Sequence, residues 1–254
     1  MTQNDLPADL VEALRSASRV AVLTGAGVSA ESGIPTFRDA QTGLWAQYDP
    51  MSLASPEGFE ANPALVWDWY QWRRELIAGA SPNPGHLALA KMAAGFDSFI
   101  LITQNVDGFH QLAGVGDVLE LHGNIQRSIC SRTRKIISCD WIERHAESRP
   151  PPSPHHEQGL ARPDVVWFGE TLDEAILNAA LGAARDCDLM IVAGTAGAVQ
   201  PAASLPFIAG EAGARVIDVN PEVTAISRSA DWHLAGPSAA WLPALARALE
   251  ATGC

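Results

Sequence analysis

The chain has 254 residues, which is enough for one large domain or for one domain that carries an insertion. Its 29 acidic side chains outnumber 17 basic ones, and the net charge of −12 argues against nucleic acid as a partner because such a surface repels phosphate groups. No apolar run is long enough to cross a bilayer and no secretory signal is visible, so we expect a cytoplasmic protein with no membrane partner.

Short apolar runs alternate with helical patterns along the chain. Nearly continuous apolar strands separated by helices are typical of a parallel sheet that is covered on both faces. The sequence therefore predicts an α/β fold with a Rossmann-like parallel sheet and helices on both faces. Strands are expected at 19–24, 98–103, 189–193 and 215–220, and helices at 9–16, 63–77, 84–94, 173–184, 202–211 and 241–251.

Two stretches interrupt this alternation. Residues 40–80 are helical and rich in tryptophan, and residues 124–162 are polar and then rich in proline. We expect these two stretches to form a smaller inserted domain. Residues 1–39, 81–123 and 163–254 would then form the Rossmann-like domain, and a cleft between the two domains would be a natural binding site.

A glycine-rich turn follows the first predicted strand, in the sequence VAVLTGAGVSAESG at 20–33. Gly25 and Gly27 would let the backbone approach a pyrophosphate, which the N-terminus of the next helix stabilises through its free N–H groups. The turn therefore predicts a dinucleotide site. An ordinary dehydrogenase would add an acidic residue after a second strand roughly 20 residues further on. Residues 35–50 are a predicted loop instead, so the pattern does not favour a simple dehydrogenase.

Further blocks follow this turn, and together they resemble the sirtuins, the NAD-dependent protein lysine deacylases. The resemblance runs from about residue 19 to the C-terminus. It implies NAD as cofactor, acylated lysine side chains of other proteins as substrates, and nicotinamide and O-acyl-ADP-ribose as products. The blocks are GAGVSAESGIPTFRDAQTGLW at 25–45, TQNVDGFHQLAG at 103–114, LHGN at 121–124, RPDVVWFGE at 162–170, GTAGAVQPAA at 194–203 and DVNPE at 218–222.

The resemblance assigns the catalytic roles to His122 and Asn105. In sirtuins the acyl carbonyl oxygen of the substrate attacks C1′ of the nicotinamide ribose, nicotinamide leaves, and a histidine acts as base on the ribose hydroxyls. His122 matches that histidine, and a neutral imidazole near physiological pH suits the task. Asn105, together with Gln104, would contact the nicotinamide ribose and its attacking water.

The same blocks imply which residues hold NAD. Asp107 would bind the carboxamide, Thr195 would cradle phosphate or ribose with its backbone, and Asn220 would hold the adenosine ribose. Phe37 is expected to shield the reacting carbon after nicotinamide leaves. The expected cofactor-binding set is Gly25, Ala26, Gly27, Ser29, Ala30, Phe37, Arg38, Trp45, Gln104, Asn105, Val106, Asp107, Gly194, Thr195, Ala196, Asn220, Pro221, Glu222 and Ser238.

The sequence DWYQWRREL places Tyr70 and Arg73 three residues apart on a predicted helix, so they share one face. This Tyr-x-x-Arg resembles the sirtuins that remove succinyl or malonyl groups, in which the guanidinium and the phenol bind the acyl carboxylate. An amphipathic surface helix with a solvated arginine pair is the alternative. The expected substrate-binding set is Tyr70, Arg73, Val165, Val166, Trp167 and Phe168.

The zinc module of sirtuins usually carries two Cys-x-x-Cys pairs, and this chain departs from that pattern. Cys130 matches the first position, but Thr133 stands at the second, and Pro154 and Glu157 fall where the second pair is expected. Two interpretations stay open: the segment binds zinc through ligands with unusual spacing, or it is a loop without metal. The candidate ligands for the first case are Cys130 and Cys139 with the neighbouring His155 and His156.

Two other functions stay open on the same scaffold. A protein mono-ADP-ribosyltransferase would need NAD and Arg38 but would have less need of His122, so the intact histidine favours deacylation. A non-catalytic NAD-sensing module would bind NAD without releasing nicotinamide.

Overall fold

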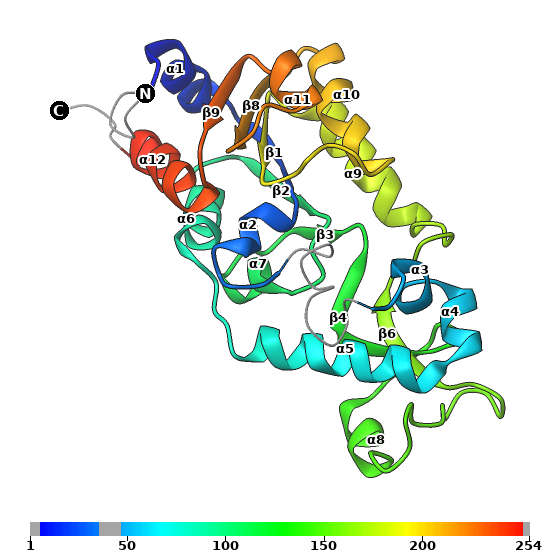
Figure 1. Ribbon diagram of the computed structural model, residues 1–254. Helices are drawn as coiled ribbons and strands as arrows, with labels where there is room; N and C mark the ends of the chain where they lie inside the picture. The colour runs from blue at the N-terminus through cyan, green and yellow to red at the C-terminus, as the bar shows by residue number, and fades with distance from the viewer. Residues whose placement is uncertain (1–5, 36–46, 251–254) are drawn as a thin grey trace.

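The computed structural model describes residues 6–35 and 47–250, and its centre is a six-stranded sheet (Figure 1). Neighbouring strands pair in parallel throughout, in the order β3-β2-β1-β7-β8-β9. The four strands expected from apolar runs are confirmed, and two short strands flank them at the edges. The strands are β1 (Arg19–Thr24), β2 (Ser98–Thr103), β3 (Val118–Glu120), β7 (Leu189–Ala193), β8 (Arg215–Asn220) and β9 (Trp232–Ala235).

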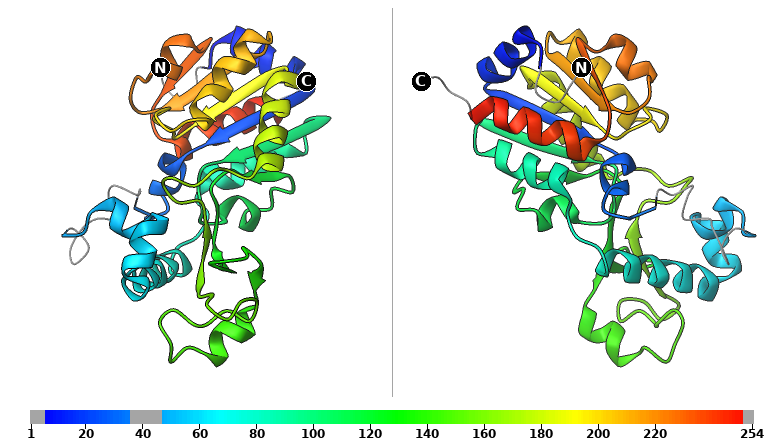
Figure 2. Two further views of the ribbon diagram at one scale, coloured as in Figure 1. Left: turned by 90° about the vertical axis from the view of Figure 1, so that its right-hand side faces the viewer. Right: turned by 60° about the vertical axis from the view of Figure 1, so that its left-hand side comes forward.

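Helices cover both faces of this sheet (Figures 1 and 2). They are α1 (Ala8–Ser16), α6 (Pro84–Ala93) and α12 (Ser238–Glu250) on one face, and α9 (Glu174–Asp186), α10 (Leu205–Glu211) and α11 (Ala225–Ser229) on the other. Val20 and Val22 of β1 pack in the first buried cluster, and the alternate residues Ala21 and Leu23 pack in the second. Because both faces are buried, β1 is a continuous apolar run. The expected Rossmann-like sheet is confirmed.

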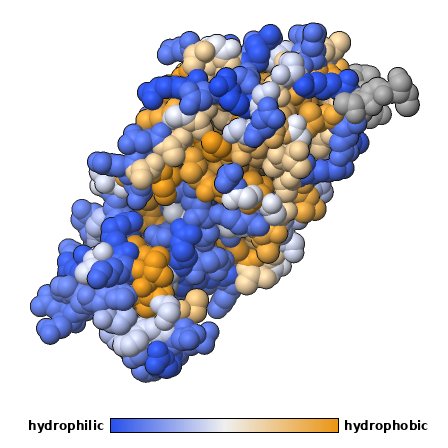
Figure 3. Space-filling model, turned by 180° about the vertical axis from the view of Figure 1, so that it is seen from behind, coloured by the Kyte–Doolittle hydropathy of each residue, from blue (hydrophilic) through white to orange (hydrophobic). Residues whose placement is uncertain are grey.

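The two interrupting stretches form a second group of elements beside the sheet (Figure 2). Much of the surface at the end that carries α8 is hydrophilic (Figure 3). The expected division into two domains stays a prediction, but its boundary at residue 162 falls inside β6, because Pro163 pairs with Ser128. The elements are α3 (Pro50–Leu53), α4 (Pro56–Ala61), α5 (Pro63–Ala78), α8 (Cys139–Arg144) and an antiparallel sheet of β4 (Gly123–Cys130), β5 (Ile136–Ile137) and β6 (Ala161–Val165).

Helix α5 is fixed against β4 by polar contacts. Asn62 caps its N-terminus, since the side-chain oxygen accepts a first-turn N–H at 3.1 Å. Toward the other end of the helix, Arg74 donates from Nε to the Ile125 carbonyl at 2.6 Å and from Nη2 to the Arg127 carbonyl at 2.9 Å. These bonds set the orientation of α5 and so help to fix the buried face that carries Tyr70.

The six expected helices are present, with small differences at their ends. The helix expected at 202–211 starts as the 3₁₀ turn η2 (Ala202–Ser204) before α10, and α12 starts three residues earlier than expected. Short helices such as α7 (Phe109–Leu112) were not predicted because they are too short to show a helical period, whereas α2 (Ala26–Ala30) lies where a helix was expected after the glycine-rich turn. Within residues 6–35 and 47–250, no helix has the length and apolar character needed to span a membrane.

Candidate active site

Two glycine-containing turns meet at the carboxyl ends of β1 and β7. The Gly27 N–H donates to the Gly194 carbonyl at 2.8 Å, and a Cβ atom at Gly27 would lie 2.8 Å from the Gly194 Cα. Gly194 has φ +62°, and a Cβ there would collide with the Val28 nitrogen. The glycines are thus needed for the two turns to touch. Ala26 and Ala196 are exposed in these turns and carry only methyl groups, which leaves room for a dinucleotide backbone.

Three polar side chains expected to contact the cofactor lie together at the same edge of the sheet. The Ser29 hydroxyl donates to the Asp107 carboxylate at 2.7 Å. The side-chain amide of Asn105 donates to the Gly25 carbonyl at 3.0 Å and to the Ser29 hydroxyl at 3.1 Å. All three side chains are buried, and Asp107 also accepts the Phe109 N–H at 2.9 Å. Because these bonds hold each group in one orientation, the cluster is preorganised for a ligand.

His86, which sequence reasoning missed, extends this cluster into the core. The Asn83 N–H donates to Nδ1 of His86 at 3.3 Å, so the imidazole proton sits on Nε2, which faces the Ser29 hydroxyl at 3.4 Å. Burial lowers the pKa of His86, and the Asp107 charge opposes that shift. The neutral imidazole therefore donates toward Ser29, which in turn donates to Asp107. Its capping-box position at the start of α6 was the available sequence signal.

His122 lies between β3 and β4 and is held from two sides. Its Nδ1 lies 3.0 Å from the Gln104 carbonyl oxygen, which only accepts, so Nδ1 carries the proton and Nε2 carries the lone pair. Its own carbonyl accepts the Val166 N–H at 2.9 Å. Burial lowers the pKa of His122, and the Gln104 carbonyl opposes the shift. A neutral imidazole with a lone pair on Nε2 is the state that a general base requires.

Residues at the carboxyl ends of three strands meet next to Gln104, whose carbonyl contacts this histidine. The Gln104 side-chain amide donates to the Thr195 hydroxyl at 3.0 Å, and the Asn220 amide donates to the Thr195 carbonyl at 2.7 Å. His233 Nε2 lies 2.9 Å from the Asn220 carbonyl oxygen and supports that segment from β9. The carboxyl ends of parallel strands are where open α/β sheets bind ligands, and these side chains lie at such ends. That they bind NAD there stays a prediction.

The remaining expected cofactor residues are more scattered. Pro221 and Glu222 are exposed after β8, whereas Ser238 is buried at the start of α12. Ala30 is exposed at the end of α2, and the Val106 carbonyl accepts the Ile125 N–H at 2.8 Å. The contacts to NAD expected of all these side chains stay predictions. Phe37, Arg38 and Trp45 lie outside the described residues.

Arg73 lies against Tyr70 on one face of α5, as expected, and Tyr70 contacts Trp167. The Trp167 indole N–H donates to the Tyr70 hydroxyl at 2.9 Å. The Arg73 guanidinium lies 5.1 Å from the ring centre of Trp69 and 5.9 Å from that of Tyr70. Burial lowers the pKa of Arg73, while Tyr70 and Asp107 raise it. Within residues 6–35 and 47–250, no carboxylate forms an ion pair with Arg73.

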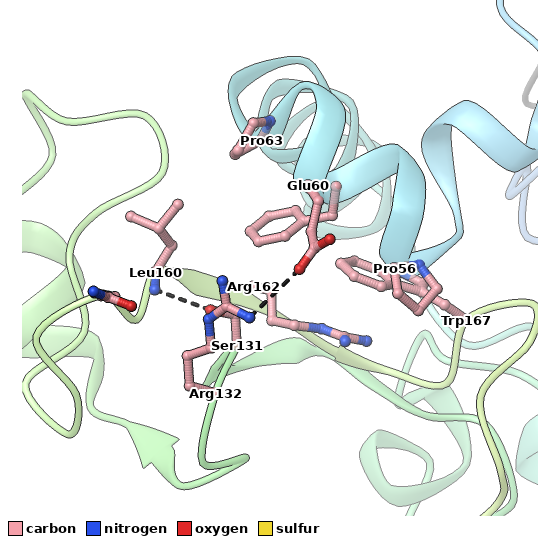
Figure 4. A pocket seen from close by; sticks show the side chains of 10 residues that line it. Pro56, Glu60, Pro63, Ser131, Arg132, Leu160, Arg162 and Trp167 are labelled. Carbon is pink, nitrogen blue, oxygen red and sulfur yellow. Dashed lines mark hydrogen bonds and ion pairs between the residues drawn. The ribbon is translucent and has the colours of Figure 1, made fainter.

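The segment after β6 is held in place by a buried ion pair. Arg162 donates to both carboxylate oxygens of Glu170, at 2.6 and 2.9 Å, and its guanidinium carbon lies 3.3 Å from the ring centre of Trp167. A cavity of about 440 Å³ beside this pair is lined by residues that include Phe59, Arg162 and Trp167 (Figure 4). Its lining includes Trp167 of the expected substrate-binding set but not Tyr70, Arg73 or His122. Phe168 is exposed, whereas Val165 is buried in β6.

The expected zinc ligands are not brought together. Cys130 is buried at the end of β4, and Cys139 is exposed at the first residue of α8. His155 Nε2 donates to a backbone carbonyl at 2.8 Å, and His156 Nδ1 accepts a backbone N–H at 3.1 Å. In the described part of the chain, no three His, Cys, Asp or Glu side chains converge as metal ligands do. The set built on Cys130 and Cys139 is not assembled among the described residues, and zinc binding by it stays an untested prediction.

Known proteins resemble this chain in sequence. An NAD-dependent protein deacylase from Methylococcus capsulatus is 46% identical over 256 residues, covering 95% of this chain and 96% of the relative. One from Aquifex aeolicus is 52% identical over 218 residues, covering 84% and 88%.

Solved structures agree with these relatives. A Sir2 homologue in complex with NAD matches with a TM-score of 0.88 and 38% identity, covering 98% of this chain and 96% of that one. A complex of Sir2 with a p53 peptide and NAD matches with a TM-score of 0.81 and 30% identity, covering 96% of each chain. The Sir2 family model itself matches residues 25–201. The chain therefore belongs to the Sir2 family.

Proposed function

We propose that this protein is an NAD-dependent protein lysine deacylase that passes an acyl group from lysine to ADP-ribose and releases nicotinamide. The names of its relatives and the NAD and peptide complexes of similar structures support this proposal. So does the convergence of Ser29, Asn105 and Asp107 where two glycine turns meet. When bound, NAD supplies the ribose carbon that the acyl oxygen attacks and nicotinamide as the leaving group.

His122 would act as the general base in this reaction. The Gln104 carbonyl fixes the proton on Nδ1, so Nε2 is the nitrogen that takes a proton from a ribose hydroxyl. The lowered pKa keeps the imidazole neutral near physiological pH. Asn105 would orient the water and ribose beside it, with its amide held by Gly25 and Ser29.

We further propose that the enzyme removes acyl groups that end in a carboxylate, such as succinyl and malonyl. The observation that carries this proposal is Arg73, a largely buried guanidinium that has no ion-pair partner among the described residues and faces aromatic rings. A buried cation without a counter-charge is costly, and a guanidinium binds a carboxylate through two parallel hydrogen bonds. The phenol of Tyr70, already oriented by Trp167, would donate a third.

The experiment that tests both proposals is mass spectrometry of matched acetyl-, malonyl- and succinyl-lysine peptides incubated with NAD. We expect loss of the acyl mass, formation of O-acyl-ADP-ribose, and a higher kcat/KM for the acidic acyl groups. Transfer of ADP-ribose onto the peptide would support the ribosyltransferase alternative. NAD binding without nicotinamide release on any peptide would support a sensing module. Preference for acetyl would contradict the acyl-carboxylate proposal while leaving deacylation in place.

A further inference from the structure

Four side chains meet where the loop after β4 approaches the loop before β6. They belong to two pairs that are each separated by two residues, which is the spacing of a zinc knuckle. A Cβ atom at Gly159 would lie 2.8 Å from the Cys130 sulfur and 3.1 Å from the Cβ atoms of both Ser153 and His156. The hydroxyls of Ser153 and Thr133 lie close enough to that sulfur to lower the pKa of the Cys130 thiol, against the effect of burial. We call Cys130, Thr133, Ser153 and His156 the Cys130 cluster.

This geometry shifts the second expected pair by one residue. Counting back from RPDVVWFGE places that pair at Pro154 and Glu157, but both residues are exposed. Ser153 is buried instead, beside the Cys130 sulfur, and its N–H donates to the Gly159 carbonyl at 2.8 Å. The positions equivalent to the family's metal ligands are therefore those of the Cys130 cluster.

The Cys130 cluster does not fit zinc. Protein ligands of structural zinc are thiolates, imidazole nitrogens and carboxylates, usually four in a tetrahedron. The cluster offers one thiol and two neutral hydroxyls. Its imidazole, that of His156, is exposed and uses Nδ1 to accept the Gln158 N–H at 3.1 Å. At least two of the four ligands are missing.

Direct contacts hold the loop after β4 and the loop before β6 together, which is the role of the metal ion in a zinc module. Cys130, with no exposed surface, packs in one buried cluster with Trp67 of α5, Ile137 and Ala161. The two loops are also bonded to each other, since the Ser131 N–H donates to the Leu160 carbonyl at 2.9 Å and the Leu160 N–H donates to the Ser131 hydroxyl at 3.0 Å.

Contacts to the helical elements hold the module as well. Arg132 reaches Glu60 of α4 at 3.4 Å, and Arg149 reaches Asp68 of α5 at 3.5 Å. The first of these pairs and the bond between Ser131 and Leu160 are visible beside the cavity (Figure 4). Both ion pairs are exposed and contribute little alone, so the buried sulfur and the aromatic packing are the main substitutes for the metal.

We propose that residues 124–162 fold without zinc, and that hydrogen bonds to the Cys130 sulfur replace the metal centre of the family. When zinc binds a structural site, its binding free energy adds to the free energy of folding. A zinc-dependent domain is therefore destabilised by a chelator, whereas we expect residues 124–162 of this chain to keep their stability. The proposal concerns stability and metal content, and it is therefore independent of the proposed catalytic function.

The test measures metal content and thermal unfolding of the full chain, purified without chelator from medium supplemented with zinc. We expect far less than one zinc per chain by elemental analysis, the same Tm with and without chelator, and equal refolding yields in both buffers. One tightly held zinc per chain, together with a lower Tm in chelator, would overturn the proposal.

A designed variant tests the geometry. Thr133→Cys with Ser153→Cys completes three thiols and His156 at knuckle spacing, so this double variant should gain about one zinc and a chelator-sensitive Tm. Thr133→Val with Ser153→Ala is the matched control. It should bind no zinc and should lose roughly 2–4 °C or more in Tm, because hydrogen bonds to the sulfur are removed. A folded double-cysteine variant that binds no zinc, or a control with unchanged Tm, would contradict the assignment. If the double variant does not fold, the wild-type metal content still decides the proposal.

Discussion

The backbone N–H of Val166 donates to the carbonyl of His122 at 2.9 Å. This bond joins the proposed base to the segment expected to hold the acyl-lysine. The bond from Nδ1 of His122 to the Gln104 carbonyl, at 3.0 Å, joins the same residue to the segment after β2. Because the two segments meet at one histidine, the base is positioned relative to both substrates before either binds, and such positioning lowers the entropy cost of the reaction.

Replacing His122 with alanine should remove deacylation without preventing NAD binding. The imidazole is needed only to take a proton from ribose, and general-base catalysis contributes about 10²–10⁴-fold to a rate. We expect kcat, measured by mass spectrometry of the peptide, to fall by that order while calorimetry still detects NAD binding. His145→Ala is the control, since that imidazole stacks on Trp141 away from the site and its loss should leave kcat unchanged. A near-normal rate for His122→Ala would show that another group is the base.

The pH dependence of kcat should report the environment of His122. Burial lowers the pKa of this imidazole below its ordinary value of 6.5, and the Gln104 carbonyl opposes the shift without reversing it. The base works only when neutral, so activity is retained as the pH falls to 6.5 and is lost below it, where the proton binds. A profile of kcat from about pH 5 to 8 checks this. An acid limb centred above the ordinary histidine pKa would contradict it.

The sheet could be predicted from the sequence because its central strands are buried on both faces. β7 is entirely apolar, and β1 is apolar between Arg19 and Thr24 at its two ends, so both strands can be recognised from the sequence. β3 and β9 were missed, since three or four residues at a sheet edge leave no period to detect. The loop before β6 was not predictable in this way, because only the fold shows that Ser153 is buried near the Cys130 sulfur while Pro154 is exposed.

Residues of the candidate site could be predicted where they stand in a recognisable motif. A residue that only positions another side chain could not be predicted. Asn105, Asp107 and His122 stand in recognisable blocks at the ends of strands, and the structure brings them to one edge. His86 lies on a different helix and acts only through Ser29, so its capping-box position marks the start of α6 but does not point to the cofactor site. Such a role depends on tertiary contacts that are distant in the chain.

Gly27→Ala should separate the two turns and weaken both folding and NAD binding. The new Cβ would lie 2.8 Å from the Gly194 Cα, where only backbone atoms are available to move. Overpacking of this kind costs about 1–3 kcal/mol, which urea unfolding measures, and calorimetry should show weaker NAD binding. Gly182→Ala in α9 is the control, because nothing lies within 4 Å of its Cβ and alanine favours a helix by up to about 1 kcal/mol. Unchanged stability and affinity in Gly27→Ala would contradict the role of the turn contact.

Arg73→Met should change the acyl preference while leaving the fold intact. Losing a buried charge-assisted pair to the acyl carboxylate costs on the order of 2–5 kcal/mol, so kcat/KM for succinyl-lysine should fall more than tenfold. Acetyl-lysine offers no carboxylate and should lose little. Tyr70→Phe should give a smaller loss of the same kind, because it removes one hydrogen bond and leaves the guanidinium. Arg149→Met, at an exposed arginine that pairs with Asp68, controls for the loss of an arginine. Equal losses on both peptides would make α5 merely structural, and unchanged kinetics on both would place Arg73 outside the pocket.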